Sequence, residues 1–127
     1  MTYCDLIGLP FENGTRGPDR FDCYGLVKFL IERDTGQRVP DYESPADSGR
    51  VHALMTCSIL FWNQLPGPRV GSMVMFRLGR EVCHVGYVIS NDRFIHAWEK
   101  TGGVTTERLA DWDKRIVGFY EYIEEAK

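Results

Sequence analysis

Phe21-Asp22-Cys23-Tyr24-Gly25-Leu26-Val27-Lys28-Phe29-Leu30-Ile31 is the stretch of this sequence that predicts its fold. Aliphatic residues recur after the cysteine at three- and four-residue spacings, as on the apolar face of an amphipathic helix: Leu26, Val27, Leu30 and Ile31. Asp22 is a suitable cap before this helix, and Gly36 is a suitable stop after it. We therefore predict a helix that begins near Cys23 and turns this face, the cysteine included, toward the rest of the domain.

Cys23 has a candidate chemical role because it lies in the first turn of the predicted helix. Unpaired backbone N–H groups and the positive end of the helix dipole favour a thiolate over a thiol at this position. A cysteine on an apolar face is also commonly a small buried hydrophobe without any chemistry. A histidine brought to Cys23 by the fold would favour the catalytic interpretation, because a nucleophilic thiol needs a base.

Length and composition restrict the class of protein. The chain has 127 residues, 43% of them hydrophobic and 26% charged, which predicts one globular domain over residues 1–127. Its net charge of −3 gives no basic surface for nucleic acid. No apolar run has the length of a signal peptide or a membrane span, so we expect a chain made in the cytoplasm without a membrane partner. The cysteines are too scattered for a disulfide scaffold, and reduced thiols are expected: Cys4, Cys23, Cys57 and Cys83.

The two halves of the chain carry different patterns. Residues 3–20 hold many Gly and Pro residues and predict an irregular arm. Ser44-Pro45 predicts the start of a second helix, with His52 on its solvent side. Short β-type runs separated by turn residues then follow: 72–78, 82–89, 93–98, 104–107 and 116–123. Helices first and an antiparallel meander afterwards predict an α+β domain.

Two histidines lie in neighbouring β-type runs. His84 is in the second run and His96, twelve residues later, is in the third, so a hairpin can bring them together. Gly86 shares the strand face of His84 and leaves room there for a helix that would carry Cys23 to His84. Each histidine alone would be interpreted as a hydrogen-bonded, partly buried residue. Together with Cys23 they form a candidate set of nucleophile, base and orienting group.

Zinc binding is the other common use of cysteine and histidine. The sequence has no C-x-x-C or H-x-x-x-H pair. Cys83 and His84 are adjacent on a predicted strand and would point to opposite faces of it. We therefore expect no metal and no cofactor.

The chain resembles the NlpC/P60 cysteine peptidases. Three ordered blocks carry the resemblance: Phe21–Val27 for the family's Asp-Cys-x-Gly-Leu-Val block, His84-Val85-Gly86 for its His-Val-Gly strand, and Phe94–Ala97 for its Phe-Ile-His-Ala strand. Ile7–Phe11 and Val117–Tyr120 resemble the versions that phages and prophages encode as tail components.

The resemblance implies a papain-like fold, with N-terminal helices packed on an antiparallel β-sheet. It implies that Cys23 is the nucleophile, His84 the general base and His96 the residue that orients His84. The implied substrate is a peptidoglycan stem peptide, cut beside D-glutamate and often at its γ-linked bond to a diamino acid. No cofactor is implied, and phage tail proteins would be further partners in a virion tail.

Other functions on the same scaffold remain open. One alternative is a tail-assembly subunit in which the fold is kept for packing and the triad is idle. Another is a transferase or amidase. The chain also departs from the family pattern at Tyr24, where serine is usual, and at Ser72, where aspartate is usual. Many members carry a tyrosine before the cysteine that helps line the site, and here Phe11 or Gly14 lies in that region.

Overall fold

The computed structural model describes residues 3–45 and 47–123. Its elements are α1 (Cys23–Thr35), α2 (Ser48–Ser58), the 3-10 helix η1 (Ile59–Phe61), β1 (Trp62–Leu65), β2 (Met73–Leu78), β3 (Glu81–Val88), β4 (Arg93–Trp98), the 3-10 helix η2 (Glu99–Thr101), β5 (Gly103–Arg108), the 3-10 helix η3 (Leu109–Arg115) and β6 (Ile116–Tyr122). In the described part of the chain, no helix has both the length and the apolar character needed to cross a membrane.

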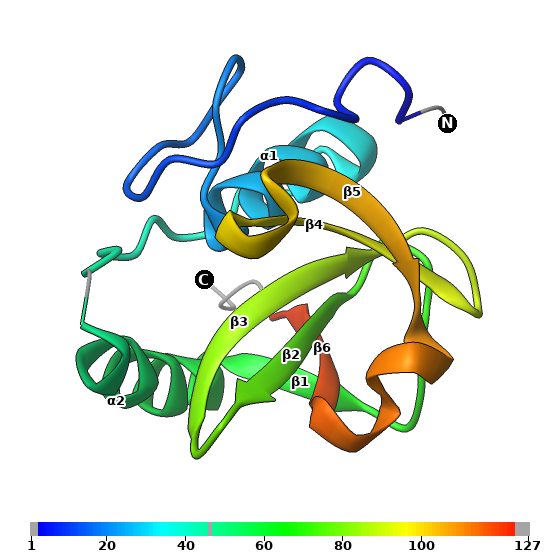
Figure 1. Ribbon diagram of the computed structural model, residues 1–127. Coiled ribbons are helices and arrows are strands. Elements are labelled where there is room, and N and C mark those ends of the chain that lie inside the picture. The colour runs from blue at the N-terminus through cyan, green and yellow to red at the C-terminus, as the bar shows by residue number, and fades with distance from the viewer. Residues whose placement is uncertain (1–2, 46, 124–127) are drawn as a thin grey trace.

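The strands form one antiparallel sheet in the order β1-β6-β2-β3-β4-β5. Helix α1 packs against β3 and β4, and α2 packs against β3. Figure 1 shows the sheet curving, so that β4 and β5 lie beside α1 while α2 lies next to the β2–β3 hairpin. The arm at residues 3–20 is irregular, as expected, and the predicted α+β fold with helices packed on an antiparallel sheet is confirmed.

The core has two clusters on the two faces of the sheet. Alternate residues of β2 point to opposite faces, and Met73 belongs to the first cluster while Val74 belongs to the second. The first cluster contains the apolar face of α1, as predicted from Phe21–Ile31. The second is rich in aromatic residues, with Phe76, Phe94 and Trp112 at its centre. The 3-10 helix η3, which the sequence did not predict, contributes Trp112 to this second cluster.

The prediction for the second helix was wrong at its start. Helix α2 begins at Ser48 and is capped by Asp47, whose side chain accepts a hydrogen bond from the Gly49 N–H. Ser44 lies three residues before this cap, and its hydroxyl accepts a hydrogen bond from Arg16. A contact distant in the sequence therefore overrides the local Ser-Pro signal.

Two further features differ from the sequence-based expectation. Strand β1 was not predicted, and Asn63 near its centre is a residue with low β-propensity. It forms an edge of the sheet by pairing with β6. His52 is only partly exposed, and its Nδ1 accepts a hydrogen bond of 2.8 Å from the Val82 N–H, which ties α2 to β3.

Candidate active site

The start of α1 is fixed by the buried carboxylate of Asp22. Its Oδ1 accepts a hydrogen bond of 2.7 Å from the Gly25 N–H, and its Oδ2 accepts one of 2.9 Å from the Gly14 N–H. The predicted cap is thus confirmed, and Cys23 is the first helical residue. Gly25 is required there, since a Cβ would lie 2.3 Å from the Thr15 carbonyl oxygen.

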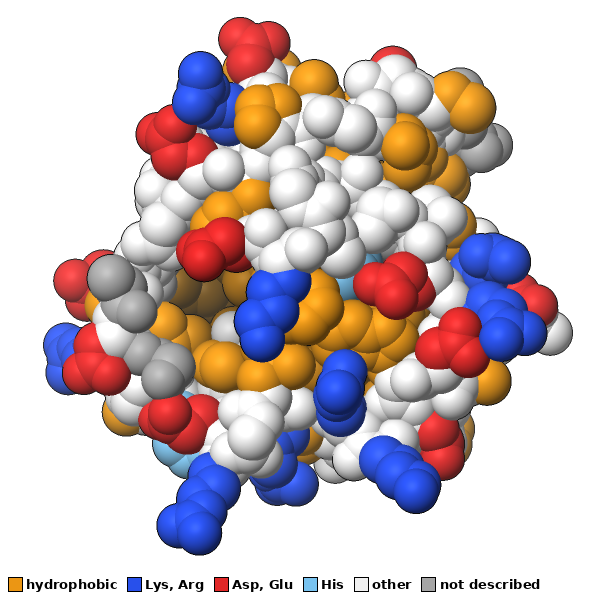
Figure 2. All heavy atoms as spheres, in the orientation of Figure 1, with side chains coloured by type: hydrophobic (Ala, Val, Ile, Leu, Met, Phe, Trp, Pro, Cys, Tyr) orange, Lys and Arg blue, Asp and Glu red, His pale blue; other side chains and the backbone are white. Residues whose placement is uncertain are grey.

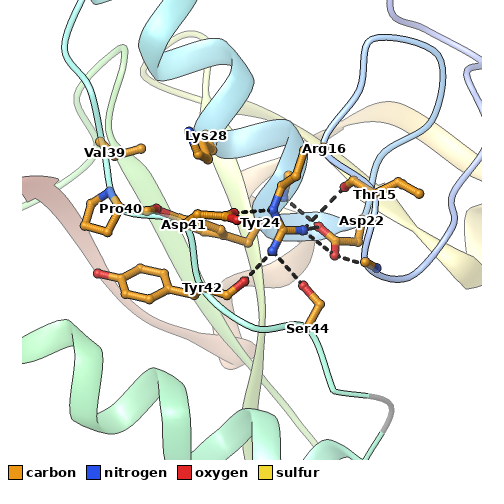
Figure 3. Close-up of polar contacts among 12 residues, drawn as sticks. Thr15, Arg16, Asp22, Tyr24, Lys28, Val39, Pro40, Asp41, Tyr42 and Ser44 are labelled. Atoms are coloured by element: carbon orange, nitrogen blue, oxygen red, sulfur yellow. Dashed lines mark hydrogen bonds and ion pairs between the residues drawn. The ribbon is translucent and has the colours of Figure 1, made fainter.

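Arg16 connects this cap to the extended segment at residues 39–44 (Figure 3). Its Nη1 lies 2.7 Å from Asp22 Oδ2, and its Nε lies 2.6 Å from Asp41 Oδ1. Its Nη2 donates to the Tyr42 carbonyl oxygen and, at 3.0 Å, to Ser44 Oγ. One guanidinium therefore joins the N-terminal arm, the start of α1 and the segment at residues 39–44.

Both departures from the family pattern have structural roles here. Tyr24 packs its ring 5.1 Å from that of Tyr42, and its hydroxyl donates to the Pro40 carbonyl oxygen at 2.6 Å. It thereby holds the segment at residues 39–44 along α1. Ser72 Oγ donates to the Arg69 carbonyl oxygen at 2.6 Å and closes the turn before β2.

The surroundings of Cys23 favour the thiol over the thiolate, the opposite of what its place at the helix start favours. Burial, together with the adjacent Asp22 carboxylate, raises the pKa of Cys23 to about 12. The backbone N–H groups of Val85 and Tyr24 lower this pKa, but by less. The stabilisation that a helix start gives to a thiolate is therefore outweighed by the loss of solvent and by a neighbouring negative charge.

The two predicted histidines belong to a hydrogen-bonded chain of four side chains. His84 Nε2 lies 2.7 Å from His96 Nδ1, which confirms that the β3–β4 hairpin brings them together. His96 Nε2 lies 2.6 Å from Glu107 Oε2 on β5. The other oxygen, Glu107 Oε1, accepts a hydrogen bond of 3.0 Å from Trp112 Nε1 in η3.

Both rings are uncharged at neutral pH. His84 and His96 are 2% and 0% exposed. Burial lowers the pKa of each, well below its ordinary value for His84, where the neighbouring His96 adds to the effect. Glu107 opposes this shift at His96 without reversing it. A neutral imidazole has one N–H donor and one acceptor nitrogen, so each ring can pass a proton along the chain.

His84 packs with the aromatic cluster rather than under α1. Its ring centroid lies 5.7 Å from that of Phe76 and 5.9 Å from that of Trp112. The Phe94 ring lies in the space that Gly86 leaves open. A Cβ at position 86 would be 2.8 Å from this ring. The prediction that α1 would occupy this space was therefore wrong, because the neighbouring strand fills it.

Cys23 and His84 nevertheless line the same cavity, of about 370 Å³. Figure 2 shows a hollow with hydrophobic side chains inside it and charged side chains at its edge, on the face seen in Figure 1. Besides these two candidate groups, the polar residues that line the cavity include Asn13, Glu43, Ser44, Glu99 and Lys100. Within the described residues, Cys23 makes no hydrogen bond to His84 or His96, and no group of His, Cys, Asp and Glu side chains could hold a metal ion.

Glu107 and Trp112 were missed by the sequence analysis. Their signal is present but depends on register, because β5 pairs with β4 so that Thr105 lies opposite His96. Glu107 then shares the strand face of Thr105, two residues along. Counting the register across the turn at Gly102 would have placed this carboxylate near His96.

Known proteins resemble this chain over most of its length. The model described as the NlpC/P60 family matches residues 8–121. The "Probable endopeptidase p60" of Listeria innocua is 30% identical over 115 residues, which cover 89% of this chain and 22% of that protein. The "Murein DD-endopeptidase MepS/Murein LD-carboxypeptidase" of Escherichia coli K12 is 27% identical over 114 residues, covering 89% of this chain and 55% of that protein.

A solved structure has the same fold. NlpC2 from Trichomonas vaginalis superposes with a TM-score of 0.71 at 20% identity, over 94% of this chain and 43% of that one. The chain thus spans about a fifth of the Listeria relative and about half of the Escherichia coli relative.

Proposed function

Because this chain belongs to the NlpC/P60 family, we propose that it is a cysteine peptidase that hydrolyses peptidoglycan stem peptides beside D-glutamate. The names of its relatives in Listeria and Escherichia coli, both endopeptidases, support this substrate class. One observation carries the proposal: the chain of polar side chains through His84 and His96 ends at the cavity that Cys23 lines.

In the proposed mechanism Cys23 is the nucleophile, His84 is the general base and His96 orients His84. His84 uses Nε2 to bond His96, which leaves Nδ1 as the nitrogen that accepts the thiol proton. The sulfur attacks the amide carbonyl, and the imidazolium of His84 returns the proton to the leaving amine, giving a thioester. Water, deprotonated by His84, then hydrolyses the thioester and frees Cys23. No cofactor enters either step.

The electrostatics of the site suit a proton that moves during the attack. A thiol with a pKa of about 12 gives up its proton only as the carbon–sulfur bond forms. Burial keeps His84 neutral and ready to accept it, and makes its imidazolium a strong acid toward the leaving amine. Backbone N–H groups at the start of α1 would stabilise the oxyanion, at roughly 3 kcal/mol per donor.

We further propose that the protein acts as a phage or prophage tail component, cutting stem peptides locally during DNA entry or tail maturation. The support is the resemblance of Ile7–Phe11 and Val117–Tyr120 to the phage versions. The second of these lies in β6, between β1 and β2. In this setting the chain is made in the cytoplasm and reaches peptidoglycan within the tail.

One observation favours a second candidate function, a structural tail subunit with an idle triad. Cys23 is a partly buried thiol with a raised pKa and no hydrogen bond to His84 among the described contacts. A subunit kept for packing could retain this arrangement without turnover.

Purified protein incubated with muropeptides distinguishes the two functions. The peptidase yields fragments that mass spectrometry identifies as cut beside D-glutamate. A protein that leaves the muropeptides intact but retains tail proteins in a pull-down contradicts the peptidase and supports the structural subunit. Fragments cut elsewhere, or acyl groups transferred to an added amine, would instead indicate the amidase or transferase.

A further inference from the structure

Glu107 is placed between two hydrogen-bond donors. Its Oε2 lies 2.6 Å from His96 Nε2, and its Oε1 accepts the Trp112 indole N–H at 3.0 Å. An indole can only donate, so Oε1 must act as an acceptor. A carboxylate offers acceptors at both oxygens, whereas the amide of glutamine offers one acceptor and one donor.

The carboxylate decides which nitrogen of each histidine carries the proton. Since Glu107 accepts, neutral His96 must hold its hydrogen on Nε2 and present Nδ1 as an acceptor. His84 Nε2, 2.7 Å from that acceptor, must then be the donor. The remaining nitrogen, His84 Nδ1, is left without a hydrogen and can act as a base.

We propose that Glu107 is a positioning residue that sets the tautomers of His96 and His84, so that His84 Nδ1 is available to take a proton from Cys23. The catalytic consequence rests on the proposed peptidase function, whereas the tautomers do not. Trp112 contributes to this positioning, because its N–H donates a hydrogen bond to Oε1 and so fixes the carboxylate of β5 against η3.

Glu107→Gln is the informative variant. In this variant the Trp112 indole N–H donates to the amide oxygen, so the amide NH₂ faces His96 Nε2. That nitrogen must become an acceptor, which moves the His96 hydrogen to Nδ1 and, in turn, the His84 hydrogen from Nε2 to Nδ1. The base is then blocked by its own hydrogen although every side chain remains in place.

Imidazole ¹⁵N chemical shifts report these tautomers directly. The chain has three histidines, and the third supplies an internal reference: His52 Nδ1 accepts from the Val82 N–H, so His52 carries its hydrogen on Nε2. At pH 8 we expect all three rings in the wild type to carry the hydrogen on Nε2. In Glu107→Gln, His84 and His96 change to the Nδ1–H form and His52 does not. A wild type with His84 in the Nδ1–H form, or a Glu107→Gln variant with His84 unchanged, overturns the proposal.

Activity adds a second readout and a rescue. Glu107→Gln is expected to lower kcat on muropeptides by about 10²- to 10⁴-fold, the usual contribution of a general base, with little change in KM. In the double variant Glu107→Gln/Trp112→Phe the indole donor is gone, so the amide oxygen can turn to His96 and restore the tautomers and part of kcat. A double variant no better than Glu107→Gln contradicts the two-acceptor argument.

A matched control separates this effect from the loss of any carboxylate. Glu121 has an exposed carboxylate that lies 2.8 Å from Arg69, and it is in β6, three strands away from β4 and His96. Glu121→Gln is expected to leave the tautomers and kcat unchanged. A wild type with the expected tautomers but no cleavage of muropeptides refutes the peptidase function alone. A wild type that cleaves them with other tautomers refutes the role of Glu107 alone.

Discussion

Replacing Arg16 by methionine removes the cation that Asp22 faces and keeps most of the side-chain volume. Asp22 is 3% exposed, so the variant leaves a buried carboxylate without its ion-pair partner. Breaking a buried pair in this way costs about 3–5 kcal/mol. Two conditions favour the lower end of this range of destabilisation. The Arg16 side chain is 24% exposed, and Asp22 keeps its hydrogen bonds from Gly14 and Gly25.

We therefore expect Arg16→Met to lower the free energy of unfolding by about 3 kcal/mol, a decrease of roughly 10 °C in Tm for a domain of this size. Urea denaturation followed by circular dichroism measures this. Arg20→Met is the matched control, because Arg20 and Glu12 form a pair of 2.7 Å that is more than half exposed on both sides. That variant should lose less than about 0.5 kcal/mol. If the two variants lose equal amounts, Arg16 does not organise the start of α1, and the reasoning is refuted.

Three further outcomes follow from the site. With its pKa raised to about 12, only about one Cys23 side chain in 10⁵ is a thiolate at pH 7. Iodoacetamide should therefore modify the exposed Cys57 before Cys23. Mass mapping that finds Cys23 labelled first at pH 6.5 contradicts this. Burial lowers the pKa of the two histidines on β3 and β4, so below about pH 6.5 the unfolded chain binds protons that the folded chain does not. The free energy of unfolding should therefore decrease by up to about 2.7 kcal/mol for each unit that the pH is lowered below that value. Urea midpoints that agree at pH 7 and 5.5 speak against it. Gly25→Ala places a Cβ 2.3 Å from a backbone oxygen, whereas a Cβ at Gly67 would meet open space. Gly25→Ala should therefore unfold at a clearly lower temperature than Gly67→Ala. Equal melting temperatures would exclude that clash.

The parts of the fold that depend on local signals were predictable. The cap at Asp22, the apolar face of α1 and the stop at Gly36 all lie within the segment that they organise, and each is present in the structure. The start of α2 was misplaced for the opposite reason. Ser44 has the right local sequence for a cap, but Arg16, 28 residues before it, uses its hydroxyl.

The candidate site was predictable to the extent that sequence spacing determines contacts. The twelve-residue gap that brings His84 to His96 could be read along one hairpin. Glu107 could not be found without the register of the next strand pair, and the protonation of Cys23 could not be found without its burial. A helix start alone favours a thiolate, and only the packed structure shows that lost solvent and the Asp22 charge outweigh it.

The central claim is that Cys23 is the nucleophile that cuts stem peptides. Its most direct test is the rate of muropeptide cleavage by Cys23→Ala, measured beside the wild type and beside Cys57→Ala, an exposed cysteine on α2 that does not line the cavity and serves as the control. All three proteins should show the same circular dichroism spectrum. The account predicts that the wild type and Cys57→Ala release fragments at similar rates and that Cys23→Ala releases none. Cleavage by folded Cys23→Ala at the wild-type rate would contradict it.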